Sequence, residues 1–358
     1  MTNPLHTWLA QTLALSGSDL HLSAGLAPMV RVHGALQTLP SPPVCAHQLE
    51  ALLHAALPDW RVAAHRQDSP AAGASTPPNP LDHDTAIDWP GLGRFRVNVF
   101  AQARGWSSVW RVIPQQVPSL EAIGAPACLT EWARQPHGLL LVTGATGSGK
   151  STTLAALVHH LNTTQALHIL TLEDPIEFVH TSQRSLVQQR SVPGHSAGFD
   201  TALRAALRQD PDVVLVGEMR DLPTVRLALS AAETGHMVLG SLHTRSATQA
   251  VERLVDVFPS SDKALVRQQL SLSLLGVVTQ TLCRRADGAG RVAAHELLYA
   301  TPAVRNLIRE SKTAQLPTVQ QTGAQFGMQT LAQSLAGLVA QGRITPEEAL
   351  HHAPALAT

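Results

Sequence analysis

The chain has 358 residues, which is enough for two domains of ordinary size with large hydrophobic cores. Apolar residues make up 44% of it and charged residues 15%, a balance typical of a globular protein and not of a disordered or fibrous one. Lys plus Arg equals Asp plus Glu at 26 each, so the formal net charge is zero. Because nucleic-acid binders usually carry a basic excess, this balance disfavours a nucleic-acid partner.

The cysteines and the apolar runs exclude further classes of protein. Cys45, Cys128 and Cys283 are far apart and form no C-x-x-C pair, so we expect small buried residues and no zinc knuckle or disulfide framework. No run of about 18 apolar residues occurs, which argues against a membrane span, and the first ten residues do not have the pattern of a signal peptide. We therefore expect a cytoplasmic protein that reaches a membrane only through a partner.

The first third of the chain mixes helical and extended patterns, which predicts a smaller α+β domain over residues 1–114. The stretch at 69–80, SPAAGASTPPNP, lacks bulky apolar residues, so we expect a surface loop insertion there. Pro114 and Pro118 mark a linker at 115–122. The expected elements are helices at 5–15 and 47–57 and strands that begin at Asp19 and cover 29–33, 93–100 and 107–113.

From Gly138 onward, continuous apolar runs alternate with amphipathic helices. Apolar strands separated by helices indicate a parallel sheet that is covered on both faces. Beyond about residue 260 the pattern is mainly helical. We therefore predict an α/β domain over residues 123–358 with a helical C-terminal part. The expected elements are strands at 139–143, 168–172, 213–216 and 237–242 and helices at 150–161, 201–208 and 223–232.

Residues 144–151, GATGSGKS, match the phosphate-binding pattern G-x-x-x-x-G-K-[ST] in full, between a predicted strand and a predicted helix. The glycines let backbone N–H groups surround phosphates at the positive end of the helix, while Lys150 reaches the β and γ phosphates and Ser151 binds Mg²⁺. The pattern arises by chance in roughly 1% of chains of this length, so a Gly-rich turn without a ligand is the weaker interpretation. The predicted nucleotide-binding residues are Gly144, Ala145, Thr146, Gly147, Ser148, Gly149, Lys150, Ser151 and Thr152.

An apolar strand that ends in a carboxylate follows at residues 212–218, DVVLVGE. In P-loop enzymes an Asp at this strand end commonly holds Mg²⁺. Here Gly217 occupies that place, so we expect Glu218 to act on the metal or on the attacking water. The alternative is a carboxylate that only caps the next segment, which the complete phosphate-binding pattern makes weaker.

Three carboxylates lie in the sequence LEDPIE at residues 172–177, just after a predicted strand. Ligands of parallel α/β sheets bind at the carboxyl ends of the strands, so Glu177 could orient or deprotonate water there. On spacing alone, a solvated acidic turn is the better interpretation.

Histidines and arginines give weaker signals. His236 and His243 bracket one predicted strand, and only His243 lies at the carboxyl end, where it could sense a nucleotide. The pair forms no zinc site without further ligands. Arg96 and Arg111 belong to predicted strands of the first domain, where planar guanidinium donors could stabilise phosphate charge. From the pattern alone, a solvated strand face is the simpler interpretation.

Together these motifs resemble the PilT family of type IV pilus retraction ATPases, within the secretion-ATPase superfamily. The block AVRNLIRE at 303–310 is typical of retraction motors and not of assembly or secretion ATPases. The other blocks are DLHLSAG at 19–25, GRFRVNVF at 93–100, the phosphate-binding loop, LEDPIEFVH at 172–180, DPDVVLVGEMRDL at 210–222, AAETGHMVLGSLHT at 231–244 and GMQTL at 327–331.

The resemblance implies a PAS-like N-terminal domain and a RecA-like C-terminal domain, with ATP bound between them. It assigns an acidic box to residues 173–177, an atypical Walker B glutamate to Glu218 and a histidine box to His236 and His243. It further assigns nucleotide-reaching arginines to positions such as Arg96 and Arg111. Glu177 is then the preferred general base, although its role and that of Glu218 could be exchanged. The implied catalytic residues are Glu177, Glu218, Lys150, Arg96, Arg111 and His243, with Ser151 and Glu218 as metal ligands.

The implied function is Mg²⁺-dependent ATP hydrolysis by a homohexamer that drives pilus retraction and twitching motility. The implied partners are a pilus platform protein of the inner membrane, at whose inner face the motor lies, and a paralogous retraction ATPase. The nearest alternatives are an accessory retraction paralogue and a pilus-assembly or type II secretion ATPase, which commonly carries a four-cysteine zinc module. A RecA-like nucleic-acid translocase is a more remote alternative.

Overall fold

The computed structural model describes residues 3–32, 34–57, 82–114, 116–192, 195–196, 198–288 and 290–353. The chain divides into two compact units, residues 1–115 and 116–358. The predicted loop insertion at 69–80 lies outside the described residues. No helix in the described ranges has both the length and the apolar composition that crossing a membrane requires.

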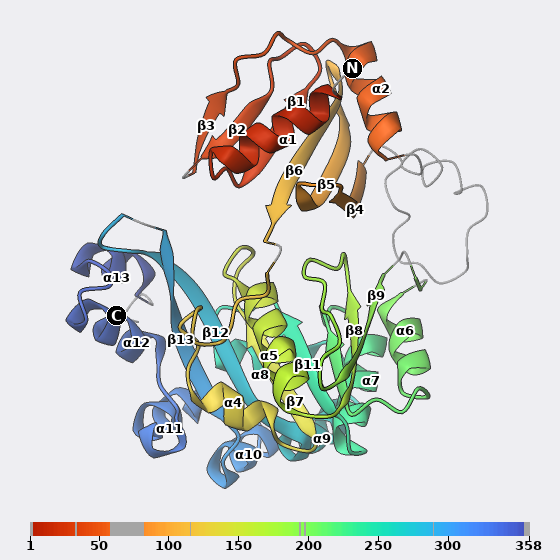
Figure 1. Ribbon diagram of the computed structural model, residues 1–358. Coiled ribbons are helices and arrows are strands. Elements are labelled where there is room, and N and C mark those ends of the chain that lie inside the picture. The colour runs from red at the N-terminus through yellow and green to blue at the C-terminus, as the bar shows by residue number, and fades with distance from the viewer. Residues whose placement is uncertain are drawn as a thin grey trace. The chain divides into compact units, whose positions relative to one another are not determined.

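The N-terminal unit is α+β, as predicted. Where the structure describes it, an antiparallel sheet runs in the order β3-β2-β1-β6-β5-β4 (Figure 1). Its elements are α1 (Pro4–Ala14), β1 (Asp19–Ser23), β2 (Met29–Val32), β3 (Ala35–Thr38), α2 (Ala46–Ala56), β4 (Asp82–Trp89), β5 (Gly93–Gln102) and β6 (Gly105–Ile113).

Strict alternation in β5 separates the two faces of this sheet. Phe95, Val97 and Val99 are fully buried and form one hydrophobic core with the apolar residues of α1 and α2. The intervening Arg94 and Arg96 are only partly buried. Because side chains alternate along a strand, the sequence GRFRVNVF produces one core face and one face of polar side chains.

The C-terminal unit is built on a sheet whose order, within the described residues, is β13-β12-β7-β11-β10-β8-β9 (Figure 1). All neighbouring strands are parallel except β13, which is antiparallel to β12. The elements up to β11 are α4 (Cys128–Ala133), β7 (Gly138–Thr143), α5 (Lys150–Thr164), β8 (His168–Glu173), β9 (Leu186–Ser191), α6 (Phe199–Ala206), β10 (Val213–Val216), α7 (Leu222–Glu233) and β11 (Met237–Leu242).

The parallel sheet is covered on both faces, as its continuous apolar runs predict. In β7, Leu140 and Val142 pack in the same core as α4 and α5, whereas Leu139 and Leu141 belong to the core that α6, α7 and α8 complete. Every residue of β7 is buried. A strand enclosed in this way holds the loop that follows it in a fixed position.

The prediction of a mainly helical chain beyond residue 260 was wrong for residues 274–284 and 291–299, which form two long strands. After α8 (Ala247–Asp256) and α9 (Lys263–Ser273), β12 (Leu274–Arg284) begins without a break in the apolar pattern, and β13 (Arg291–Tyr299) pairs with it. Periodicity does not distinguish a buried strand from a buried helix, and β12, with 11 residues, is also as long as a helix. Helices do follow: α10 (Pro302–Arg309), α11 (Leu316–Thr322), α12 (Leu331–Ala340) and α13 (Pro346–His352).

Leu140→Ala tests the core beneath β7. We expect the free energy of unfolding to fall by about 2 to 5 kcal/mol, because the change leaves a cavity at a fully buried position. Leu265→Ala on α9, where the leucine is 57% exposed, is the matched control and should change it by less than about 0.5 kcal/mol. Denaturant unfolding followed by circular dichroism measures both, and equal effects would contradict this placement of Leu140.

Candidate functional site

Four loops with polar residues meet at one edge of the C-terminal sheet. The strands β7, β11, β10 and β8 are neighbours and run parallel, so their carboxyl ends lie together. The loop at 144–149 follows β7, and the acidic turn at 173–177 follows β8. Glu218 lies just beyond β10 and His243 just beyond β11. This edge is where parallel α/β sheets bind their ligands.

The loop at 144–149 has the backbone of a phosphate-binding loop. Gly144, Gly147 and Gly149 have φ angles of 144°, 77° and 92°, which favour glycine. A Cβ atom at Gly144 would lie 2.5 Å from the carbonyl oxygen of Gln280 on β12. No side chain caps the start of α5 at Lys150, so the N–H groups of its first turn remain available to an anion.

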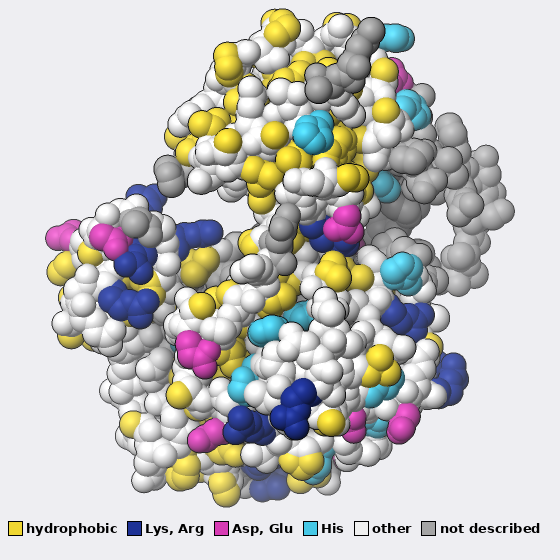
Figure 2. Space-filling view, viewed as in Figure 1, with side chains coloured by type: hydrophobic (Ala, Val, Ile, Leu, Met, Phe, Trp, Pro, Cys, Tyr) yellow, Lys and Arg dark blue, Asp and Glu magenta, His cyan; other side chains and the backbone are white. Residues whose placement is uncertain are grey.

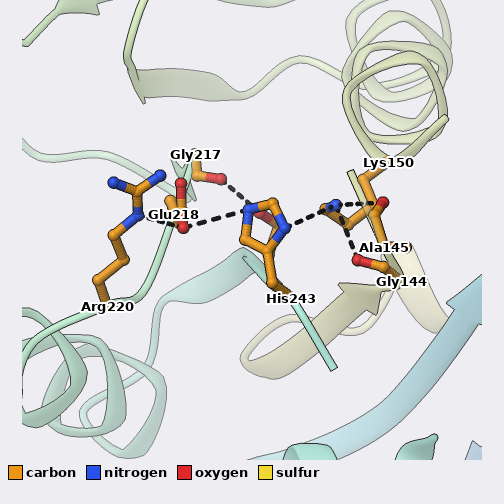
Figure 3. A network of polar contacts seen from close by, with 8 residues as sticks. Gly144, Ala145, Lys150, Gly217, Glu218, Arg220 and His243 are labelled. Atoms are coloured by element: carbon orange, nitrogen blue, oxygen red, sulfur yellow. Dashed lines mark hydrogen bonds and ion pairs between the residues drawn. The ribbon is translucent and has the colours of Figure 1, made fainter. Parts of the chain in front are cut away.

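The Lys150 ammonium contacts both the loop at 144–149 and His243 (Figure 3). Its Nζ donates to the carbonyl oxygens of Gly144 at 2.9 Å and Ala145 at 3.0 Å and lies 3.5 Å from Nδ1 of His243. Burial lowers the pKa of Lys150, and the charges of Glu218 and then Glu177 oppose this effect. Both predicted carboxylates therefore act on the lysine of the loop.

Glu218 joins a chain of polar contacts that ends at this lysine. Its Oε1 lies 3.2 Å from Nε2 of His243, and it also accepts a hydrogen bond from Nε of Arg220 (Figure 3). The bond to Glu218 raises the pKa of Arg220. His243 thus contacts Lys150 with one ring nitrogen and Glu218 with the other.

The glycine in place of the usual Asp has a steric explanation. A Cβ atom at Gly217 would lie 2.9 Å from the carbonyl oxygen of Leu172 and 3.2 Å from Cα of Glu173. Its N–H donates to the same oxygen of Leu172 at 2.7 Å. Because the neighbouring strand end excludes any side chain here, the carboxylate has to come from the next residue, Glu218.

The acidic turn is not simply solvated. The Glu173 carboxylate accepts hydrogen bonds from Thr171 at 2.6 Å and Gln189 at 3.1 Å, and burial raises its pKa. The peptide bond between Asp174 and Pro175 is cis. Glu177 is half-buried. Glu173 is thus held as part of the structure, whereas the charge of Glu177 acts on the site.

The oxygen atoms around the loop fit a small hard cation. Ser151 is exposed on the first turn of α5, next to half-buried Thr152, and Glu218 supplies a carboxylate. Ser148 Oγ is buried and has no hydrogen-bond partner among the residues that the structure describes. Hydroxyl and carboxylate oxygens are the ligands that Mg²⁺ prefers.

The two predicted arginines lie in the N-terminal unit. Arg96 on β5 and Arg111 on β6 are directly opposite each other in the strand register. Arg96 pairs with Asp84 at 2.7 Å, and Arg111 pairs with Asp19 at 2.8 Å. Because residues directly opposite each other on neighbouring strands point to the same face, this sheet has two guanidinium groups on one face.

His236 lies at the other end of β11 from His243, as the sequence indicates. Its Nδ1 is 3.1 Å from the carbonyl oxygen of Ala231, so it takes part in ending α7. It does not join the contacts around Lys150 that the structure describes.

The sequence analysis missed two residues of the site. Arg220 donates a hydrogen bond to Glu218. Its position two residues after Glu218 was the only feature of the sequence that could have indicated this contact. Gln280 accepts a hydrogen bond from Thr153 of α5 at 2.7 Å, with both residues buried. Gln280 lies in β12, a strand that the helical interpretation concealed.

A family model described as type II/IV secretion system protein matches residues 92–351. The chain belongs to this family. It is 51% identical over 341 residues to the type IV pilus retraction ATPase PilT of Pseudomonas aeruginosa, covering 95% of each protein. It is 37% identical to the type IV pilus ATPase PilU of the same organism, covering 94% of this chain and 85% of PilU.

A solved structure of the pilus retraction motor PilT with bound ADP also matches this member of the family. The TM-score is 0.85 at 40% identity, and the match covers 97% of this chain and 96% of that one. The predicted fold class and the resemblance to the PilT family are therefore confirmed.

Glu173→Gln tests the half-buried carboxyl group of the acidic turn. Burial raises the pKa of Glu173 in the folded chain. The protonated carboxyl group therefore stabilises the fold fully below the ordinary pKa of 4.5, and this stabilisation is lost as the pH rises through the pKa of the folded state. Gln keeps the acceptor oxygen and does not titrate. We expect the Tm of the wild type minus that of Glu173→Gln to fall as pH rises above 4.5.

Glu310→Gln is a control in which the Tm difference should change with pH in the opposite direction. The hydrogen bond from Lys312 lowers the pKa of Glu310, so its contribution is lost as pH falls. The corresponding Tm difference should therefore rise with pH. Thermal unfolding at a series of pH values below and above 4.5 measures the Tm of both variants and of the wild type. A Tm difference between the wild type and Glu173→Gln that does not change with pH would contradict a raised pKa at Glu173.

Proposed function

We propose that this chain is an ATPase and that six copies of it form the motor that retracts type IV pili and drives twitching motility. The observation that carries the proposal is the contact chain from Lys150 through His243 to Glu218, in a chain 51% identical to a pilus retraction ATPase. The fold alone would not support it, because P-loop sheets serve many functions.

ATP binds through the loop at 144–149 and the first turn of α5. Backbone N–H groups of residues 146–149 hold the phosphates. The Lys150 ammonium exchanges its bonds to the carbonyl oxygens of Gly144 and Ala145 for bonds to phosphate oxygens on the γ side. The ADP bound to the related pilus retraction motor supports this site.

Hydrolysis proceeds by in-line attack of water on the γ-phosphate. Bound to Ser151 and Glu218, Mg²⁺ would neutralise the charge of the β and γ phosphates. Glu177 accepts the proton of the attacking water. His243, which contacts both Lys150 and Glu218, senses whether the γ-phosphate is present. The alternative assignment makes Glu218 the general base and Glu177 the carboxylate on the metal.

Arg96 and Arg111 couple the N-terminal domain to turnover. Each supplies planar donors that can leave a carboxylate of its own unit for the γ-phosphate. We assign the PAS-like domain to residues 1–114, the linker to 115–122 and the RecA-like ATPase domain to 123–358. Hydrolysis then rotates the domains as rigid bodies.

The motor acts at the inner face of the inner membrane. We infer that it binds a pilus platform protein there and that rotation of its domains releases subunits from the fibre. A paralogous retraction ATPase is a further partner. Contacts with the platform protein hold the motor in place.

The principal retraction motor is favoured over its rivals. Identity to PilT exceeds identity to PilU by 14 percentage points, 51% against 37%. With three cysteines, the chain cannot form the four-cysteine zinc module that is common in assembly and secretion ATPases. The balanced net charge disfavours a nucleic-acid translocase.

Glu177→Gln and Glu218→Gln should each reduce ATP turnover by at least about 100-fold, because general-base and charge-stabilising groups contribute that much. Both variants should still bind ATP, since the loop at 144–149 is unchanged. Phosphate release and binding of a fluorescent ATP analogue measure the two effects. Near-normal turnover in both variants would remove these carboxylates from the mechanism.

Deletion of the gene tests the biological role. We expect more surface pili and no twitching, with rescue by the wild type and not by Lys150→Ala. Pilus counts by electron microscopy and colony spreading measure the outcome. Loss of pili would indicate an assembly ATPase instead, and unchanged pili and movement would refute the retraction role.

A further inference from the structure

A second cluster of potential ligands lies where β12 meets α13. Sγ of Cys283 and one ligand atom each of Glu348 and His352 all lie within 4.8 Å of one another. In a tetrahedral zinc site, neighbouring ligand atoms are about 3.3 to 3.8 Å apart, given the usual bond lengths. Small side-chain movements would therefore bring these three atoms onto one ion.

The surrounding structure holds each of the three side chains. Cys283 is fully buried in a hydrophobic cluster that α12 helps to form. The Oε1 atom of Glu348 accepts a hydrogen bond from the backbone N–H of Arg284 at 2.7 Å and lies 3.1 Å from Nε2 of His352. The bond from Arg284 is the main reason why the pKa of Glu348 is lowered.

The two residues on α13 reach the cluster because of helix geometry. Glu348 and His352 are four residues apart, so they lie on the same side of the helix. Cys283 comes from a strand 65 residues earlier in the chain, which is why no spacing in the sequence indicated the set. Tertiary structure alone unites the three residues.

We propose that Cys283, Glu348 and His352 form a binding site for Zn²⁺, with water as the fourth ligand. A thiolate, an imidazole and a carboxylate are the donors that zinc takes in tetrahedral sites. A cavity of about 350 Å³ borders Glu348 and His352, although not the fully buried Cys283, and leaves room for the water ligand. It is lined by Leu282, Arg284, Arg291, Glu348, His351 and His352.

The charges of the site are consistent with this ion. Burial, followed by the charge of Glu348, raises the pKa of the Cys283 thiol to about 11, so zinc has to displace its proton. One thiolate and one carboxylate then neutralise Zn²⁺ completely. A neutral cluster adds no positive charge beside Arg284 and Arg291, and Figure 2 shows both basic and acidic side chains on the part of this unit where α12 and α13 lie.

The ion would link α13 to β12 of the C-terminal sheet. The link ends on β12, the strand whose Gln280 bonds Thr153 of α5. We therefore assign to this zinc a stabilising role in the C-terminal unit and no part in hydrolysis.

Cobalt titration of the purified full chain tests the site. Co²⁺ occupies tetrahedral zinc sites, and a thiolate ligand gives it an intense charge-transfer absorption that oxygen ligands at the loop at 144–149 cannot give. After chelator treatment, the wild type should bind one Co²⁺ with this absorption, and Zn²⁺ should abolish it. Absence of the absorption from the wild type would overturn the proposal.

Variants identify the ligands. Cys283→Ser should lose the charge-transfer absorption, whereas the matched control Cys128→Ser, a half-buried cysteine of the same unit, should keep it. His352→Gln removes the imidazole ligand on α13, and it should weaken Co²⁺ binding more than about tenfold. Absorption that survives Cys283→Ser, disappears with Cys128→Ser or is unaffected by His352→Gln would reject this ligand set.

Thermal unfolding gives an independent readout. Zn²⁺ that binds only the folded chain raises Tm, so it should stabilise the wild type and not Cys283→Ser in the absence of nucleotide. Equal stabilisation of both proteins would mean that zinc acts elsewhere.

Discussion

The register of four parallel strands is the constraint on which the site depends. Residues 213–216 of β10 pair with 237–240 of β11 on one side and with 169–172 of β8 on the other. Residues 237–242 of β11 pair in turn with 138–143 of β7. The strands therefore end together and deliver four loops to one edge. A slip of one residue would exchange the two faces of a strand and turn its apolar side chains away from the cores that hold it.

The close approach between the ends of β8 and β10 determines which residue can supply the carboxylate after β10. The ends of β8 and β10 are joined by the bond from the Gly217 N–H to Leu172, and this bond leaves no space for a Cβ atom. A carboxylate can enter only one residue later, where the chain has left the sheet. Glu218 then meets His243 and Arg220, which fix its position. The unusual motif is thus a consequence of tight strand packing and not a weakened site.

Much of this arrangement could be predicted from local sequence. Continuous apolar runs identified β7, β8, β10 and β11, and the loop at 144–149 identified the edge at which their ends meet. The positions of Glu177 and His243 at that edge followed from the parallel direction of the strands. The hydrogen bond that Glu173 accepts from Gln189 could not be predicted, because Gln189 comes from β9, a strand that its mixed polar sequence did not reveal.

The sequence also did not reveal β12, and this strand supports the phosphate-binding loop. Thr279 shares a hydrogen bond of 2.8 Å with Thr143, the last residue of β7, and Gln280 accepts one from Thr153 in α5. The carbonyl oxygen of Gln280 also leaves no room for a side chain at Gly144. Thus β12 contacts the end of β7, where the loop begins, and α5, the helix that follows the loop.

Polar side chains of this kind are costly to bury without partners, and in β12 those partners are supplied by Thr143 of β7 and Thr153 of α5. The pattern of apolar residues with isolated Thr and Gln, which is ambiguous in the sequence, becomes intelligible once β7 and α5 are packed against it. Helix propensity and periodicity carry no information about such partners. For this reason a strand that contacts the loop was harder to predict than the loop itself.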